Sequence, residues 1–480
     1  MNVKLIARLQ GAILLIEAAA MVPSLVIAVI YGDVTDIHAM ASAITLTLAV
    51  GLPMRCISKP DNLNTRAKEG LACVGMSWLM MSAFGAIPFM VSDMLPNFVD
   101  AFFEAVSGFT TTGATVVTSF SPYPHGVMFW RACIHWIGGM GVLVLTMALL
   151  PKLTGHTAHL IRAESPGPTF SKLVPKMGDS AKILYIIYFF LTLIEFIALL
   201  IAGLNPYDAA IHAMSTAGTG GFSNYAASVG AFMNPAAEWI ITIFMFLFGV
   251  NFALFFKVLT KDVKGALKSE ELHWYLAFAV LAIGYITWKL IPIYGSFSEA
   301  LRYSSFQVGS FMSTTGFATA DINTWPNSVQ MVLVALMFVG SCAGSTAGGM
   351  KVVRIALLFK QGGRAIQTTF QPRKIKVLHF EGQAVSPTVL SQVAVFAFVY
   401  VTTVVLGAVL ISLDECYGFS TNFTSALSCV SNVGPVLGGI SDMSGYSAFS
   451  KVVMSLLMLC GRLELFPMLV LIHPDLYRKG

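Results

Sequence analysis

Ten long apolar runs in this sequence of 480 residues limit what the chain can fold into. A helix needs about 20 apolar residues to cross the hydrocarbon core of a bilayer. Runs of about this length begin near Gly11, His38, Gly70, Gly126, Ala181, Ala236, Leu272, Ser328, Ala384 and Ser447. Apolar residues make up 56% of the chain and charged residues only 11%, too few polar side chains to cover a water-soluble globule. The sequence therefore predicts an all-α polytopic membrane protein with ten spans and excludes a soluble enzyme.

Four shorter apolar segments lie between the long runs, and each is too short to cross a bilayer. They are Phe98 to Thr112, Pro206 to Ala217, Glu299 to Thr315 and Tyr417 to Val433. Basic residues gather in other connections (55–68, 152–182, 257–268 and 351–376) and near both termini. By the positive-inside rule, both termini should be cytoplasmic, and the short segments should enter from outside as four re-entrant pore loops. The net charge of +5 reflects these inner loops, so we expect no nucleic-acid partner.

The outer side is expected to carry a set of acidic side chains. These are Asp93, Asp100, Glu104, Asp208, Glu238, Glu299, Asp321, Asp414, Glu415 and Asp442. An acidic vestibule would raise the local concentration of cations. For any single one of these residues, an ordinary place in a polar loop is an equal alternative.

After the first two runs, the order long, short, long occurs four times. We expect an amino-terminal two-helix extension (1–69) and four repeats (70–151, 181–260, 272–360 and 384–480). The short segments end in the similar strings SGFTTTGAT, MSTAGTGGF, FMSTTGFATAD and CVSNVGPVLGG. Aligning one glycine per string matches Gly113, Gly218, Gly316 and Gly434, with Ser107, His212, Ser310 and Ser428 six residues earlier. The alignment predicts four pseudo-symmetric helix–pore loop–helix repeats around one axis.

The glycine strings predict a central cation pore. Non-helical backbone at membrane depth must be buried in protein or line water, so the four short segments should meet at one cavity. A cation that enters loses its water shell, and rings of main-chain carbonyl oxygens can replace that shell. Glycine permits the left-handed or strained backbone that turns carbonyls toward the axis. The predicted cation site consists of Thr112, Gly113, Ala217, Gly218, Thr315, Gly316, Val433 and Gly434.

Two features lie where a gate would be expected. The stretch GSCAGSTAGG, in the second long run of the third repeat, is too rich in glycine and serine for a stable helix interior. We expect an intramembrane gate there, formed by Gly340, Gly344, Ser345, Thr346, Gly348 and Gly349. The absence of a counterpart in the other repeats favours a gate over a packed small-residue helix contact. Arg462, in the last run, should face the pore as a barrier to cations; alternatively, it pairs with Glu464 or extends to the inner surface.

In these residues the chain resembles the Trk/Ktr/HKT superfamily of potassium transporters, and in particular its bacterial TrkH-type subunits. The resemblance covers the full length, including the first two runs, SGFTTTGAT, STAGTGGFS, the stretch from Gly340 to Gly349 and the region of Arg462. It implies that potassium is the transported ion, that the filter glycines bind it, and that this chain carries no organic cofactor. In relatives that admit sodium, serine often replaces the first filter glycine, so Gly113 favours potassium.

The resemblance also implies partners and a location. The expected assembly is a homodimer with one pore per protomer, in contact with lipid in the bacterial cytoplasmic (inner) membrane. A cytoplasmic ring of nucleotide-binding TrkA-type subunits is the expected regulator.

Two other functional classes stay open from the residues. A secondary cation symporter, coupled to protons or sodium, usually shows inverted repeats and alternating access, whereas these four repeats share one orientation. A membrane-embedded enzyme needs a nucleophile and base, or a ligand cluster, at membrane depth. The sequence has many Ser and Thr residues there but no paired His, Asp or Cys beside them.

Overall fold

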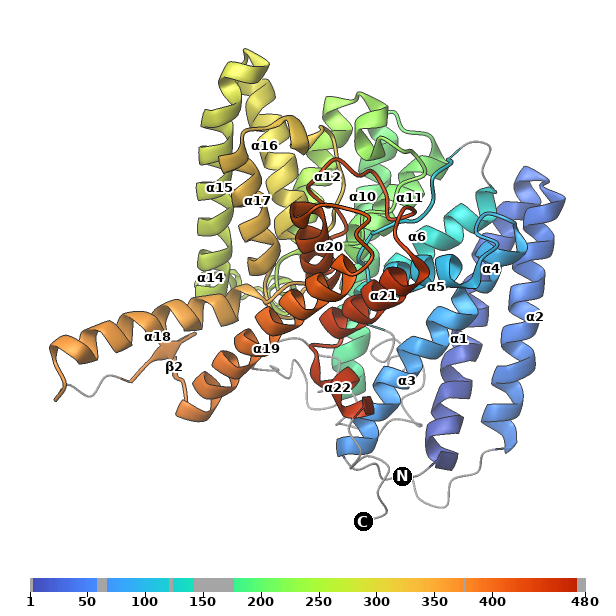
Figure 1. The fold of residues 1–480 in the computed structure, drawn as a ribbon, viewed down its shortest axis with the longest axis horizontal. Coiled ribbons are helices and arrows are strands. Elements are labelled where there is room, and N and C mark those ends of the chain that lie inside the picture. Colours follow the sequence, from blue (N-terminus) through green and yellow to red (C-terminus); the bar gives the residue numbers. More distant parts are fainter. Residues whose placement is uncertain (1–2, 58–66, 121–123, 142–176, 374–376, 473–480) are drawn as a thin grey trace.

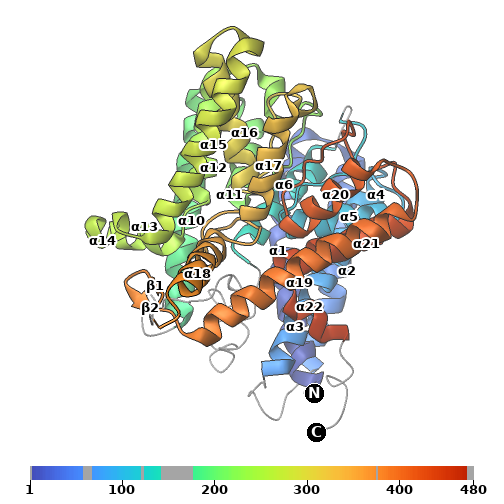
Figure 2. The same ribbon diagram turned by 60° about the vertical axis from the view of Figure 1, so that its left-hand side comes forward.

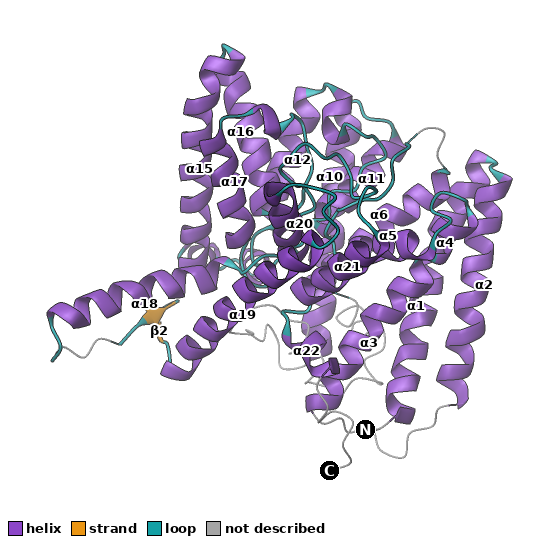
Figure 3. Ribbon diagram, viewed as in Figure 1, coloured by secondary structure: helices purple, strands orange, loops and turns teal. Residues whose placement is uncertain are grey.

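Helices form nearly all of the described part of the chain (Figure 3). The structure is a computed structural model, and it describes residues 3–57, 67–120, 124–141, 177–373 and 377–472. The amino-terminal helices α1 (Val3–Tyr31) and α2 (Val34–Ile57) form an antiparallel pair. This pair stands at one side of the molecule in Figure 1, outside the central group of short helices.

Each of the four repeats contributes a first helix, a short helix and a second helix. The first helices are α3 (Ala67–Gly85), α10 (Met177–Ile201), α15 (Glu270–Tyr294) and α19 (Pro387–Ser412). The short helices are α5 (Phe98–Phe109), α11 (Pro206–Gly218), α16 (Phe297–Met312) and α20 (Phe419–Ser431). The second helices are α6 (His125–Gly139), α12 (Pro235–Phe248), α17 (Asn327–Val339) and α21 (Ala448–Arg462). Every apolar run and short segment found in the sequence thus contributes a helix to the described part of the chain.

Smaller elements connect these helices. They are α4 (Ile87–Val91), the 3-10 turns η1 (Ser228–Phe232) and η2 (Ile322–Thr324), α13 (Phe252–Leu259), α14 (Val263–Leu267), α18 (Val352–Phe370), the strands β1 (His379–Phe380) and β2 (Gln383–Ala384), and α22 (Phe466–Ile472). The strands pair antiparallel with His379 opposite Ala384. α18 projects from the helical body in Figure 1, and Figure 2 shows α13, α14 and the hairpin projecting from it as well.

Asparagine side chains start several of these helices. Asn97 accepts a hydrogen bond from the backbone N–H of Val99 at the start of α5. Asn205 and Asn234 cap α11 and α12 in the same way, and a proline follows each of them at the first helical position. An asparagine cap satisfies N–H groups that have no partner within the helix, and proline has no N–H to satisfy there. The sequence thus fixes where two of the short central helices begin.

The helices differ in length in a way that the apolar runs did not reveal. Six helices in the described residues are long and apolar enough to cross a membrane, and α12 with α13 makes a seventh if this pair, bent by 92°, counts as one span. The four second helices have only 13 to 15 residues. At about 1.5 Å per residue they reach roughly 20 Å, less than the core of a bilayer. Each second helix therefore ends well inside the molecule.

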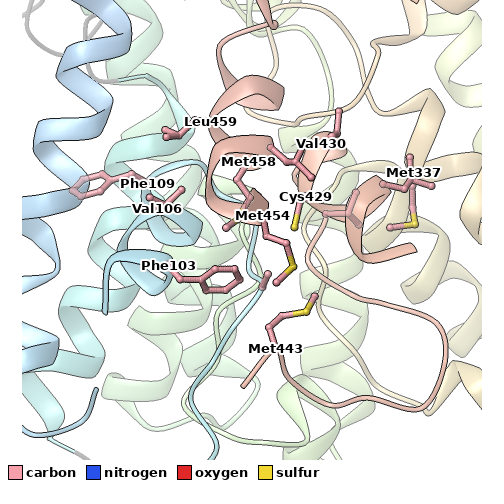
Figure 4. Close-up of a cluster of buried hydrophobic side chains, with 14 of the residues drawn as sticks. Phe103, Val106, Phe109, Met337, Cys429, Val430, Met443, Met454, Met458 and Leu459 are labelled. Atoms are coloured by element: carbon pink, nitrogen blue, oxygen red, sulfur yellow. The ribbon is translucent and has the colours of Figure 1, made fainter. Parts of the chain in front are cut away.

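Buried methionines pack the first repeat against the fourth. Figure 4 shows Phe103 of α5, Met454 and Met458 of α21, and Cys429 of α20 side by side in one cluster, and all four side chains are fully buried. The unbranched thioether side chain of methionine fills irregular gaps between helices. This contact joins the two ends of the series of repeats, so the repeats close into a ring.

Candidate functional site

All four short helices end in the same backbone turn. The turn contains one residue in the left-handed region: Thr111, Thr219, Thr314 or Asn432, with φ of 54 to 57°. The N–H group of the next residue donates to the carbonyl oxygen five positions earlier, at 2.9 to 3.0 Å, in the pairs Thr112 to Ser107, Gly220 to Ser215, Thr315 to Ser310 and Val433 to Ser428. This pattern is a Schellman cap, which ends a helix and satisfies carbonyls of its last turn. The four repeats therefore reach the site with the same geometry.

A glycine with positive φ follows each turn. These are Gly113 (77°), Gly221 (75°), Gly316 (82°) and Gly434 (97°). A Cβ atom on each would meet the carbonyl oxygen of the next repeat at 2.0 to 2.5 Å: Gly113 against Gly220, Gly221 against Thr315, Gly316 against Val433 and Gly434 against Thr112. The last contact returns to the first repeat, so the eight residues form a closed circle, here called the glycine ring. No side chain fits at the four glycine positions.

The second repeat enters the glycine ring three residues later than the sequence alignment predicted. Gly218 is the last residue of α11, and a Cβ on it would meet the carbonyl oxygen of His135 at 2.3 Å. Ala217 also lies within α11. The ring takes Gly220 and Gly221 instead, because the left-handed residue of this repeat is Thr219. The six other predicted positions, Thr112, Gly113, Thr315, Gly316, Val433 and Gly434, lie in the ring.

A serine pattern in the sequence could have revealed this register. Counting back six residues from the four ring glycines gives Ser107, Ser215, Ser310 and Ser428. The predicted alignment on Gly218 placed His212 among three serines. The carbonyl oxygens of these four serines accept the capping hydrogen bonds, so their positions follow the turns.

A cavity of about 580 Å³ opens on one side of the glycine ring. Its lining includes the four ring glycines and residues from the four segments that follow them. These segments (114–120, 222–227, 317–321 and 435–443) are here called the return segments. Only Asp321 and Asp442 of the ten predicted vestibule acids line it, together with the cationic Arg131. Three of the other acids are paired instead: Asp100 with Lys451, Glu104 with Arg131, and Glu238 with Arg302. The cavity is therefore less acidic than the sequence predicted.

On the other side of the ring lies the glycine-rich stretch of the third repeat. α17 ends at Val339, α18 begins at Val352, and the residues between them are not helical. The N–H of Gly348 donates to the hydroxyl of Thr314 at 2.7 Å, and the N–H of Gly349 donates to the carbonyl of Ser431 at 2.9 Å. The 340–351 loop is thus hydrogen-bonded to the turns that lead into the glycine ring.

Further hydrogen bonds hold the 340–351 loop from the sides. The Ser341 hydroxyl donates to the carbonyl of Met312 at 2.8 Å. The N–H of Cys342 donates to the carbonyl of Gly249, and the carbonyl of Gly344 accepts from the N–H of Phe252, both at 3.1 Å. The loop is therefore held between α16 and the segment that connects α12 to α13.

Arg462, at the end of α21 in the fourth repeat, connects the same loop to the first repeat. One guanidinium nitrogen donates to the carbonyl of Thr346 at 2.7 Å. The other donates to the carbonyls of Gly138 and Gly139 at 2.5 and 2.6 Å. The nearby Glu464 forms an ion pair with Arg354 at 2.6 Å. The cation predicted to lie in the pore region thus lies beside the 340–351 loop, held by backbone oxygens.

The break in the third repeat is not unique, contrary to the expectation from its glycine content. In the second repeat, α12 ends at Phe248 and α13 leaves at 92° after Gly249 to Asn251. In the fourth, α21 ends at Arg462, and Glu464 and Leu465 take positive φ before α22. The second helices of these three repeats all end on the side of the ring away from the cavity, which is here called below the ring. The third repeat has the longest non-helical insert among them.

The chain is similar in sequence and in fold to known cation transport proteins. The family model for TrkH, a cation transport protein, matches residues 37–476. The "Trk system potassium uptake protein TrkH" of Escherichia coli (strain K12) is 33% identical over 486 residues, and that of Salmonella typhimurium is 34% identical; both alignments cover 100% of each chain. The crystal structure of the potassium transporter TrkH from Vibrio parahaemolyticus matches with a TM-score of 0.89 and 29% identity over 100% of both chains. The chain therefore belongs to the TrkH family of cation transport proteins.

Proposed function

We propose that this chain takes up potassium through a channel-like pore whose selectivity filter is the glycine ring. The observation that carries the proposal is the closed circle of contacts between each ring glycine and a carbonyl oxygen of the next repeat. Four equivalent main-chain turns around one axis are the arrangement that replaces the hydration shell of a cation. Relatives that match over the full length are named potassium uptake proteins.

The short helices add an electrostatic contribution to this site. All four end immediately before the ring, so their carboxyl ends point toward it. The carboxyl end of a helix carries a partial negative charge, which favours a cation at the centre. Hydroxyl groups lie close by: Thr112 bonds to Thr110 at 2.8 Å and Thr315 bonds to Ser313 at 2.6 Å.

The 340–351 loop and Arg462 form the proposed gate. The loop is bonded to the entry turns of the ring, on the side away from the cavity. The fixed positive charge of Arg462 beside it opposes the passage of a cation. Opening requires the loop to leave Thr314 and Ser431, and displacement of the Arg462 guanidinium releases the carbonyl of Thr346.

The proposed topology has ten spans, with the four short second helices counted among them. α22 and the start of α1 lie at the end of the molecule opposite the return segments in Figure 1. This arrangement supports cytoplasmic termini in an inner membrane, with the return segments outside. We propose a homodimer regulated by a TrkA-type nucleotide-binding subunit on the cytoplasmic side. Light scattering of the purified protein tests the dimer, and co-purification with such a subunit tests the partner; a monomer, or no co-purification, contradicts these assignments.

Ion uptake into proteoliposomes tests the filter. The wild-type protein should accumulate rubidium as a potassium substitute, and excess potassium should compete far better than sodium. Gly113→Ser and Gly316→Ser should weaken this discrimination, because a side chain there meets a carbonyl oxygen of the ring at about 2 Å. Gly284→Ser is the matched control, since nothing lies within 4 Å of a Cβ at that position. Unchanged discrimination in both ring variants contradicts the filter assignment.

A further inference from the structure

A buried polar residue supports the return segment or outer loop of every repeat. It lies nine positions before the ring glycine in each case: Glu104, His212, Gln307 and Ser425, all at most 1% exposed. Their partners are Val116 N–H (3.0 Å) for Glu104, the Ser223 hydroxyl (3.0 Å) for His212, the Thr319 hydroxyl (3.5 Å) for Gln307 and the Tyr446 hydroxyl (3.0 Å) for Ser425. The position is thus equivalent in all four repeats, although its chemistry differs.

The first repeat alone places an ionisable pair at this position among the described residues. The Arg131 Nε donates to the Glu104 carboxylate at 2.6 Å, and the two side chains are only 3% and 0% exposed. The other carboxylate oxygen of Glu104 accepts the Val116 N–H, and both of its oxygens lie within 3.1 Å of the Thr115 hydroxyl. A buried charge pair with its remaining hydrogen-bonding sites filled holds one geometry strongly. The first return segment is therefore rigidly attached to α5 and α6.

Arg131 also extends across the boundary into the second repeat. Its Nη1 donates to the carbonyl of Ser223 at 2.8 Å. Its guanidinium lies over the Phe222 ring, 3.5 Å from the centroid, and Phe222 directly follows the ring residue Gly221. The planar arginine fork reaches two acceptors in different directions and lies flat against a ring face, whereas the lysine ammonium is a compact point charge without that fork.

A second contact supports Phe222 from behind. Phe222 stacks on His135 at a centroid distance of 4.0 Å. The His135 Nδ1 bonds to the carbonyl of Gly108, near the end of α5, at 2.7 Å. The contacts of Arg131 and His135 thus join the first and second repeats on both sides of Phe222.

We propose that the Glu104–Arg131 pair is a positioning element that sets the selectivity of the glycine ring without touching the ion. The inference rests on the proposed function of the ring. The pair fixes the return segments on both sides of the contact between Gly113 and Gly220. A ring held at a fixed spacing cannot contract around the smaller sodium ion, so its carbonyls replace the water of potassium more completely. Loss of the pair allows the first and second repeats to approach each other, so that the ring can contract around sodium and let it pass.

A second ion pair on the same helix provides a matched control. Asp100 lies one turn before Glu104 on α5 and accepts a hydrogen bond from the Lys451 ammonium group at 2.6 Å. That pair joins α5 to α21, and the hydrogen bond between its two side chains does not involve a return segment. Asp100→Asn therefore removes an ion pair of the same helix while leaving the positioning contacts in place.

The test compares the ability of sodium to inhibit rubidium uptake in three variants. The double variant Glu104→Gln with Arg131→Met removes the pair without leaving a charge stranded in the interior. Arg131→Lys keeps the charge on Glu104 paired but cannot also hold Ser223 in the same fork. Asp100→Asn is the control, and gel filtration with a thermal melt measures the folded fraction of each.

We expect sodium to compete about tenfold better in the double variant, the change that loss of one charge-assisted hydrogen bond supports. Arg131→Lys should lie between this variant and the wild type, and Asp100→Asn should discriminate as the wild type does. The inference would be overturned if the folded double variant melts at a lower temperature but sodium inhibits its rubidium uptake no better than in the wild type. The pair would then have a structural role only. Wild-type protein that does not prefer potassium would instead overturn the proposed function itself. If the double variant does not fold, Arg131→Lys decides: wild-type discrimination in that folded variant also overturns the inference.

Discussion

The four repeats have the same structure in the glycine ring and different structures in the layer directly below it. In the ring, all four repeats use the same turn, the same capping hydrogen bond and a glycine of the same backbone conformation. Below it, the second repeat bends, the third inserts a long loop and the fourth places Arg462.

The proposed function accounts for this difference, because a filter in the ring and a gate below it place different demands on the four repeats. A ring that surrounds an ion needs equivalent groups on all sides, because one displaced carbonyl leaves the ion partly unsolvated. An obstruction needs only one repeat to cross the path. Symmetry is therefore retained at the ring and lost below it, and substitutions in the two layers should fail in different ways.

The largest effect is expected from a side chain within the ring. In Gly316→Ala the Cβ would meet the carbonyl oxygen of Val433 at 2.1 Å, and φ there is positive, which costs an L-residue roughly 1–2 kcal/mol. Rubidium uptake should fall well below that of the wild type, and the uptake that remains should discriminate less between potassium and sodium, as expected for Gly316→Ser. Gly203→Ala is the control: its φ is also positive, but nothing lies within 4 Å of the Cβ. If both variants transport equally well, the close contacts of the ring have no functional importance.

Removing the positive charge of Arg462 should raise rubidium uptake instead of lowering it. Arg462→Gln loses charge-assisted hydrogen bonds to Thr346, Gly138 and Gly139. We expect uptake to rise by more than about tenfold, since each such bond contributes about 1.5–3 kcal/mol. Arg354→Gln is the comparison variant: it removes the ion pair with Glu464, a hydrogen bond to the carbonyl of Met350 and a contact with the Phe396 ring, but none of the hydrogen bonds of Arg462. Equal or lower uptake in folded Arg462→Gln protein would show that the arginine does not restrict the path.

The register of the second repeat provides a sharper test of ring symmetry. Gly221→Ser should reduce the preference for potassium over sodium by about tenfold, a change of about 1.4 kcal/mol in relative binding. Gly218→Ser meets the carbonyl of His135 rather than the ring. This variant should lower the melting temperature while its folded fraction retains the preference. The reverse result would restore Gly218 to the filter.

The smallest effect concerns the hydrogen bond that links the two layers. Thr314→Val removes the hydroxyl that accepts from the N–H of Gly348. Because a neutral hydrogen bond contributes about 1 kcal/mol, uptake should rise by about fivefold as the loop loosens. Thr219→Val is the matched variant, since Thr219 occupies the equivalent turn but its hydroxyl donates to the adjacent Gly218 carbonyl. An equal change in both variants would mean that the loop is not held at Thr314.

Hydropathy was sufficient to predict where the helices lie, but it did not show that the four second helices are short as well. The hydropathy pattern places α5, α11, α16 and α20 within a few residues, because a short, mostly apolar segment between two long apolar runs has few alternatives to a buried helix. The identity of the second ring glycine was harder. The string AGTGGF offers Gly218, Gly220 and Gly221, and only the backbone turn at Thr219 decides among them.

Other parts of the site could not be predicted from residue types. The bend after α12 falls at Gly249 to Asn251 within a continuous apolar run, so hydropathy does not mark it. The hydrogen bonds of Arg462 go to backbone carbonyls, which every residue carries, so no sequence signal identifies them. Glu104 was predicted as a vestibule acid, but its partner Arg131 lies 27 residues away and makes it part of the support of the ring instead.

The ring closes through a contact between residues at opposite ends of the repeat series. Gly434 completes the circle against Thr112, more than three hundred residues earlier in the chain. A growing polypeptide therefore holds three quarters of an unfinished ring until its final quarter has been synthesised and inserted. Products of premature termination lack the fourth repeat, so their ring stays open and polar backbone at membrane depth is left without the neighbouring repeat that would bury it.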